Sequence, residues 1–157
     1  MRSRAFIKCI FQSWIETNRC DISVWATERA KKTFPAFGIV RADALCLPFT
    51  SETFAVTTAF ETLEHCRNLD TIARQIKRVT KPNGLVLVSV PTIDLNDTYA
   101  DRSHIWHKSL TAWLHFLRQH LEILSVSYFL KFMKYLDGKT CNTYIVMRNK
   151  KGTEVIV

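Results

Sequence analysis

Glycine and proline are scarce in this chain of 157 residues, which contains four of each. That excludes collagen-like sequences and linkers rich in Pro and Gly. No apolar run approaches the roughly 18 residues that a membrane-spanning helix needs, so we expect no membrane span. What is present, 47% hydrophobic and 23% charged residues, is typical of one globular domain covering residues 1–157.

Cysteine and histidine give little support for a metal site. The five cysteines contain no Cys-x-x-Cys pair, which argues against a zinc ribbon and a dithiol redox motif. Their scatter is typical of free thiols in a reducing compartment, so we expect a cytoplasmic protein. A mitochondrial presequence stays open, because Arg2, Arg4 and Lys8 precede the first acidic residue. His104 and His107 have metal-compatible spacing but no third ligand nearby in the sequence, so no metal site is predicted.

The net charge of +8 favours anionic partners, but this charge is not concentrated. The densest cluster, Arg74, Lys77, Arg78 and Lys81, is loosely spaced. Such spacing is more typical of a solvated helix face than of a nucleic-acid interface, so we do not expect a nucleic-acid partner. A basic surface that binds RNA or acidic lipid is kept as a minor hypothesis.

Apolar periodicity predicts alternating strands and helices. The clearest helix places Leu69, Ile72, Ile76 and Val79 on one face and should end near Lys81, ahead of a proline and an Asn-Gly turn. Ser23 and Ser109 are expected to cap two further helices. The expected strands cover residues 37–40, 54–60, 85–90, 121–129 and 143–147, and the strand at 85–90 is expected to be buried on both faces. This alternation indicates an α/β sheet.

Four segments between residues 20 and 91 stand in a recognisable order. They are Asp21-Ile22-Ser23 after a strand, ADALCLPF at 42–49, ETLEH at 61–65, and RVTKPNGLVLVSVP at 78–91. In series they resemble the class I S-adenosylmethionine-dependent methyltransferases, and specifically their type 11 small-molecule subgroup. The resemblance implies a Rossmann-like sheet, mostly parallel with the last strand antiparallel, flanked by helices.

The resemblance also implies a cofactor, S-adenosylmethionine, and residues that bind it. In the family, the position of Asp21 accepts the ribose hydroxyls and the position of Asp43 contacts the adenine amino group. The methionine portion lies near the end of the fourth strand. The implied cofactor-binding residues are Asp21, Ile22, Asp43, Ala44, Leu45, Ala59 and Phe60. No catalytic residue is assigned, because methyl transfer depends mainly on positioning.

Structural roles compete with these assignments. Asp21 could cap the following helix, and Asp43 could begin a turn. Leu47, Pro48 and Phe49 are expected to pack against the core and not to contact a ligand.

Two further groups are weighed in the same way. Glu64 and His65 are expected to form a buried, hydrogen-bonded structural pair and not an acid–base pair. Trp106, His107 and Trp113 are candidates for lining an acceptor site, although core packing is favoured for Trp113.

One part of the family pattern is missing. The family opens with a strand and a glycine-rich loop, and here no glycine precedes Gly38. We therefore expect an N-terminally truncated or degenerate, incomplete domain whose first strand is absent or replaced. Either Ala5–Phe11 enters the sheet as a surrogate strand, or the neighbouring strands close up or stay solvated. A poorly folding product of a mis-started reading frame is a third possibility.

Two main functions remain. The first is methyl transfer from S-adenosylmethionine to a small-molecule acceptor, which the sequence does not identify. The alternative is a non-catalytic remnant or interaction subunit that does not bind the cofactor. The missing loop counts against cofactor binding by this chain, so the enzyme assignment is left open.

Overall fold

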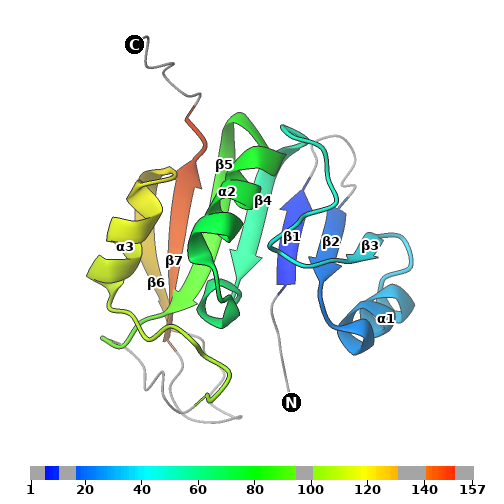
Figure 1. Cartoon of the computed structure of the whole chain (residues 1–157), viewed down its shortest axis with the longest axis horizontal. Coiled ribbons are helices and arrows are strands. Elements are labelled where there is room, and N and C mark those ends of the chain that lie inside the picture. The colour runs from blue at the N-terminus through cyan, green and yellow to red at the C-terminus, as the bar shows by residue number, and fades with distance from the viewer. Residues whose placement is uncertain (1–5, 11–16, 95–100, 131–140, 151–157) are drawn as a thin grey trace.

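The computed structural model of the chain describes residues 6–10, 17–94, 101–130 and 141–150. The strands form one seven-stranded sheet in the spatial order β3-β2-β1-β4-β5-β7-β6 (Figure 1). The elements are β1 (Phe6–Ile10), β2 (Thr17–Asp21), α1 (Val24–Thr33), β3 (Gly38–Arg41), β4 (Phe54–Phe60), the short 3₁₀ helix η1 (Leu63–His65), α2 (Leu69–Val79), β5 (Thr80–Pro91), α3 (Leu110–Arg118), β6 (Glu122–Leu130) and β7 (Cys141–Arg148).

Strand β1 fills the position between β2 and β4, so the surrogate-strand expectation is confirmed for residues 6–10. The direction of β1 was not predicted: it pairs antiparallel with both neighbours, whereas only the last strand was expected to be antiparallel. The connection explains this difference. Only residues 11–16 separate β1 from β2, and a parallel connection needs a dozen residues or more.

The rest of the sheet follows the expected topology. Strands β2 and β3 pair in parallel, as do β4 and β5, and β7 runs antiparallel to both β5 and β6. The carboxyl ends of β2, β3 and β4 therefore meet at one edge of the sheet. In an open α/β sheet this edge is where ligands bind.

Helix caps set the helix boundaries. The Ser23 hydroxyl accepts a hydrogen bond from the backbone N–H of Ala26 at 3.2 Å, and Ser109 does the same for Ala112. Helix α2 ends at Val79, close to the expected position. Asn83 follows with a φ of 62°, a left-handed conformation that asparagine tolerates better than most residues.

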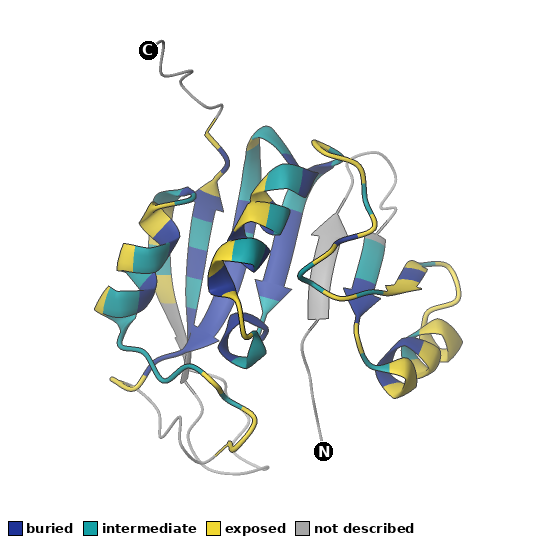
Figure 2. Cartoon of the chain, in the orientation of Figure 1, coloured by how far each residue is buried: buried dark blue, intermediate teal, exposed yellow. Residues whose placement is uncertain are grey.

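Helices α2 and α3 lie on one face of the sheet, in front of it in Figure 1. Figure 2 shows that buried residues follow the central strands of the sheet. Val86 and Val88 of β5 are buried in the same core cluster as residues of α2 and α3. Leu85 and Leu87, which point the other way, are only half-buried. Ser89, on the same face as these leucines, is buried at 1% exposure. The expectation of burial on both faces is therefore confirmed for the carboxyl-terminal half of the strand and wrong for its first half. No helix in the described ranges is both long and apolar enough to cross a membrane.

Candidate functional site

A cavity of about 290 Å³ opens at the carboxyl ends of β2, β3 and β4. Its walls come from three segments that are distant in the sequence: the end of β2, the loop after β3, and the region of η1 and α2. The lining residues are Cys20, Asp21, Ile22, Ala42, Asp43, Ala44, Leu45, Thr62, His65, Cys66, Arg67 and Ile72. Five of the seven residues expected to bind a cofactor, Asp21, Ile22, Asp43, Ala44 and Leu45, are thus brought together at one site.

Asp21 is the last residue of β2 and is 3% exposed. One carboxylate oxygen, Oδ1, accepts a hydrogen bond from the backbone N–H of Ser23 at 2.7 Å. The other oxygen, Oδ2, is buried and has no hydrogen-bond partner in the described part of the chain. Burial raises the pKa of the Asp21 carboxyl, and the Ser23 N–H partly offsets that rise. Asp21 therefore supports the start of α1 with one oxygen and keeps the other available to a ligand.

Asp43 lies two positions after β3 and is exposed. Its Oδ1 accepts a hydrogen bond from the backbone N–H of Leu45 at 2.9 Å, and its carbonyl accepts one from Cys46 at 3.0 Å. The turn expected from the sequence is therefore present. The turn also places Ala44 and Leu45 in the cavity wall, so the structural and ligand-binding interpretations are compatible.

Two thiols make part of the wall weakly polar. Burial, and secondarily the nearby charge of Asp21, raises the pKa of Cys20 to about 12. Burial also raises the pKa of Cys66 to about 12, and the Cys66 thiol donates a hydrogen bond to the Thr62 carbonyl at 3.0 Å. At neutral pH both groups are uncharged thiols. They provide a soft, largely apolar surface, such as a purine ring would contact.

The other two expected cofactor-binding residues lie elsewhere in β4. Ala59 is fully buried inside the sheet, and neither it nor Phe60 lines the cavity. The Phe60 ring instead packs edge-on against Tyr144 of β7, with centroids 6.0 Å apart. Of the three residues expected to pack, Leu47 belongs to the hydrophobic core and Phe49 contacts it. Pro48 is exposed, so the packing expectation was wrong for this residue.

The aromatic candidates for an acceptor site have structural contacts. Trp113 is fully buried, and its indole N–H donates to the Pro91 carbonyl at 3.2 Å, which confirms the core-packing interpretation. The Trp106 indole N–H donates to the Cys66 carbonyl at 2.7 Å. This bond holds the segment after β5 against the cavity wall.

The basic cluster on α2 is not uniformly free for an anionic partner. The Arg78 guanidinium donates to the carbonyls of Phe49 and Leu47 at 2.7 and 2.9 Å, and to the Gln75 amide oxygen. Arg78 thus fastens the loop after β3 to α2. A structural use of this kind counts against the RNA or lipid hypothesis.

The wall formed by η1 was largely missed by the sequence reasoning. Thr62, Cys66 and Arg67 line the cavity, and His65 was considered only as a structural residue. The signal that could have found them is their position directly after the fourth strand, at the same edge as Asp21. Cys20 was missed for a different reason, because a strand residue next to an acid carries no motif of its own.

Comparisons with known proteins agree on one family. A family model described as a methyltransferase domain matches residues 5–88, which is more than half of the chain. A demethylmenaquinone methyltransferase of Streptomyces avermitilis is 35% identical over 69 residues, or 44% of this chain and 30% of the relative. A sterol 4-C-methyltransferase of Caenorhabditis elegans is 42% identical over 50 residues, 32% of this chain and 15% of the relative. The chain thus spans less than a third of either relative.

Solved structures give the same fold. An S-adenosylmethionine-dependent methyltransferase of Methanosarcina mazei superposes with a TM-score of 0.67 at 13% identity, covering 85% of this chain and 81% of the other. The [4+2]-cyclase SpnF superposes with a TM-score of 0.68 at 17% identity, covering 85% of this chain and 65% of the other. Because a cyclase shares the fold, the fold by itself does not establish methyl transfer.

Proposed function

The chain belongs to the class I S-adenosylmethionine-dependent methyltransferases, and on this premise we propose that its cavity binds the adenosyl part of S-adenosylmethionine for methyl transfer to a small-molecule acceptor. The observation that carries the proposal is the buried, unpartnered Oδ2 of Asp21 in the cavity. A buried carboxylate oxygen without a partner is costly, and a ribose hydroxyl would satisfy it. A buried acceptor at a strand's carboxyl end fits a ribose diol.

The dimensions and the wall chemistry also support an adenosyl group. About 290 Å³ is close to the lower end of the range of small-molecule pockets, roughly 300–1,000 Å³. We assign Asp21 to the ribose, and the turn from Asp43 to Leu45 to the adenine. The Asp43 carboxylate can accept from an amino group, while Leu45 and the Cys20 thiol supply apolar contact. When bound, S-adenosylmethionine supplies an activated methyl group, so the chain's task is to hold and orient it.

We extend the proposal to an apolar acceptor. The relatives above are named for demethylmenaquinone and sterol substrates. On this chain, the segment after β5 carries Ile93 and Ile105, which are 45% and 47% exposed. Hydrogen bonds from the backbone N–H groups of Ile105 and Trp106 to the Glu64 carbonyl hold this segment beside η1. An exposed aliphatic side chain such as that of Ile105, beside the η1 part of the cavity wall, suits an apolar ring better than a sugar.

A second function is favoured by one specific observation. Strand β1 runs antiparallel, so it does not lead from the cavity edge into a glycine-rich loop and helix. Such a loop would contact the methionine portion of the cofactor. Without it, the chain would retain adenosyl recognition and lack the positioning needed for transfer. A non-catalytic, nucleoside-binding protein is therefore the alternative.

Calorimetric titration of the chain with S-adenosylmethionine tests the proposed site. We expect Asp21→Asn to weaken binding by about 1.5–3 kcal/mol, or roughly 10- to 150-fold, because a hydrogen bond to a charged group is lost. Glu28→Gln is the matched control, since Glu28 lies on the exposed side of α1 and outside the cavity. No binding at millimolar cofactor, or equal loss in both variants, would contradict the site.

Two further measurements separate the enzyme from the alternative. Transfer of a labelled methyl group to a demethylmenaquinone or sterol analogue supports the enzyme. Equal affinity for S-adenosylmethionine and 5′-methylthioadenosine, with no transfer to either analogue, supports the nucleoside-binding alternative. That combination would show that the methionine portion makes no contact.

A further inference from the structure

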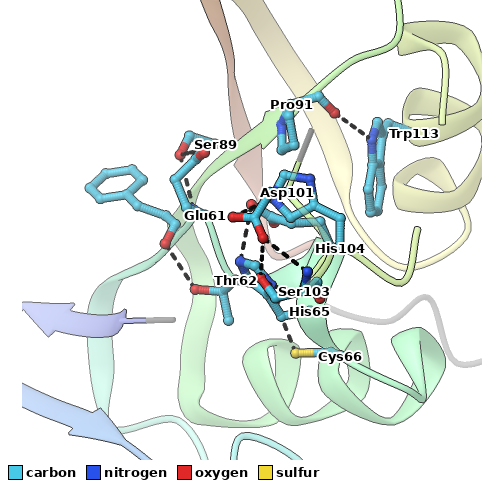
Figure 3. A network of polar contacts seen from close by, with 12 residues as sticks. Glu61, Thr62, His65, Cys66, Ser89, Pro91, Asp101, Ser103, His104 and Trp113 are labelled. Carbon is cyan, nitrogen blue, oxygen red and sulfur yellow. Dashed lines mark hydrogen bonds and ion pairs between the residues drawn. The ribbon is translucent and has the colours of Figure 1, made fainter. Parts of the chain in front are cut away.

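Three potential metal ligands meet beside the cavity, two of them adjacent in the sequence and the third about 40 residues later. Glu64 and His65 belong to η1, and His104 belongs to the segment after β5. One ligand atom from each lies within 4.8 Å of the other two. Figure 3 shows His65 and His104 in the same network of polar contacts. Their rings pack edge-on, with centroids 4.9 Å apart. Histidine and carboxylate ligands at this separation can share one cation with small side-chain adjustments.

Glu64 is the strongest indication of a ligand. Its side chain is 0% exposed, and neither carboxylate oxygen has a hydrogen-bond partner in the ranges that the structure describes. The nearest charge partner is His65 Nε2, 3.9 Å from Oε1. Glu64 is thus buried as expected, but the expected hydrogen bond to His65 is not made. A carboxylate in this position is stable only if it is protonated or paired with a cation.

The surrounding charges point the same way. The carboxylates of Glu61 and Asp101 lie close enough to Glu64 for their negative charges to act on it. Asp101 Oδ2 also lies 3.8 Å from His104 Nε2. Three acids and two imidazoles therefore converge on one small region. Their mutual repulsion would be relieved by a divalent cation.

The His65 ring is oriented as a metal ligand would be. Its Nδ1 lies 3.1 Å from the Ser103 backbone carbonyl (Figure 3). A carbonyl can only accept, so this hydrogen bond places the proton on Nδ1. The lone pair is then on Nε2, the nitrogen that faces Glu64. Metal-binding histidines commonly show this arrangement, with the second nitrogen donating to a carbonyl.

The backbone holds the third ligand in place. The N–H groups of Ile105 and Trp106 both donate to the Glu64 carbonyl, at 2.8 and 3.2 Å. The residue that carries one ligand therefore also anchors the segment that carries another. His104 is held next to η1 without a metal, so little ordering would be needed for binding.

From this geometry we infer that Glu64, His65 and His104 form a binding site for a divalent transition cation of the Zn²⁺ type. Two imidazoles and one carboxylate suit Zn²⁺ better than Mg²⁺, which prefers oxygen ligands and retains water. Three protein ligands leave a coordination position for water or another oxygen ligand. Because His65 also lines the cavity, the ion would sit in the cavity wall. The inference does not depend on the proposed function.

The test is titration of EDTA-treated, cofactor-free protein with Zn²⁺, followed by calorimetry and by the change in melting temperature. We expect one high-affinity ion per chain, a higher melting temperature, and no comparable effect of Mg²⁺. Glu64→Gln and His104→Ala should each weaken Zn²⁺ binding by at least about tenfold, since even outer-shell changes cost that much. His115→Ala, which removes an exposed histidine of α3, should bind Zn²⁺ like the unmodified chain.

Folding of the variants is checked independently. Glu64→Gln keeps the size of the side chain and removes a buried charge, so its circular dichroism spectrum should be unchanged. Co²⁺ provides a spectroscopic readout, because nitrogen and oxygen ligands give visible bands without strong thiolate absorption. The inference is overturned if Zn²⁺ does not bind, if binding survives both ligand variants, or if Co²⁺ shows a thiolate charge-transfer band that moves the site to cysteines.

Discussion

Asp21 and Asp43 line the same cavity, although they follow different strands. Strands β2 and β3 pair in parallel, and Asp21 lies opposite Arg41, two positions before Asp43. The Arg41 guanidinium donates to the Ile22 carbonyl at 3.2 Å, which further ties the two strand ends together. The pairing thus brings one buried and one exposed acid to a common site, and their environments differ enough to assign them different tasks.

The buried charge of Asp21 should reduce stability at neutral pH. Its pKa is raised by burial, so the native state holds the proton more tightly than the unfolded state. That contribution to stability is present at low pH and is lost as the pH rises through the native pKa. We expect Asp21→Asn to be nearly neutral in stability near pH 4 and stabilising at pH 7, as measured by urea unfolding. Equal effects at both pH values would contradict this assignment.

The Cys20 thiol should react slowly and be protected by a ligand. A pKa of about 12 lowers its thiolate fraction by on the order of 10³-fold relative to a free thiol. Exposed Cys46 is the internal comparison. We expect iodoacetamide to label Cys46 well before Cys20, with peptide mass spectrometry as the readout. Adenosine should slow labelling of Cys20 further, and equal rates for the two thiols would argue against the described burial.

Gly84 should not tolerate a larger side chain. A Cβ at this position would lie 2.8 Å from the Lys81 carbonyl oxygen and 2.9 Å from that of Ala55, and backbone atoms cannot easily move away. We expect Gly84→Ala to cost about 1–3 kcal/mol in the free energy of unfolding. Asn83→Gly is the matched control at a left-handed position and should change stability by less than about 1 kcal/mol. The reverse order of the two effects would contradict the turn geometry.

Asn149 should be important for the junction between α2 and β5. Its side-chain amide donates to the carbonyls of Lys77 and Thr80 at 3.1 and 2.7 Å, where the helix ends. Its backbone pairs with Asn83 and Gly84. We expect Asn149→Ala to destabilise the chain by about 1–3 kcal/mol, because the buried Thr80 carbonyl loses its side-chain donor. Lys150→Ala, at the exposed neighbour, should have little effect in the same thermal unfolding experiment.

Local patterns were sufficient to predict most elements of the fold. The spacing of Leu69, Ile72 and Ile76 predicted α2, and Ser23 and Ser109 were correctly expected as caps. The direction of β1 was not predicted, because a short apolar run does not indicate whether a strand runs parallel or antiparallel to its neighbours. Once the short connection to β2 is considered, the antiparallel direction follows from chain length alone.

The sequence predicted only those residues of the site that belong to recognisable motifs. Asp21 and Asp43 stand in recognisable segments, and both line the cavity. The grouping of Glu64 and His65 with His104 was not expected, since the histidine follows a long intervening segment and its neighbours in sequence offered no third ligand. Hydrogen bonds between the two segments, to the Glu64 carbonyl and between His65 and Ser103, bring these residues together. Contacts of this kind depend on tertiary structure, and no pattern in the sequence predicts them.

A crystal structure of the chain with 5′-methylthioadenosine tests the central claim most directly. We expect the ribose hydroxyls to lie within hydrogen-bond distance of Asp21 Oδ2, and the purine to lie along the turn from Asp43 to Leu45. A nucleoside bound at another surface, with Asp21 still unpartnered, would contradict the account.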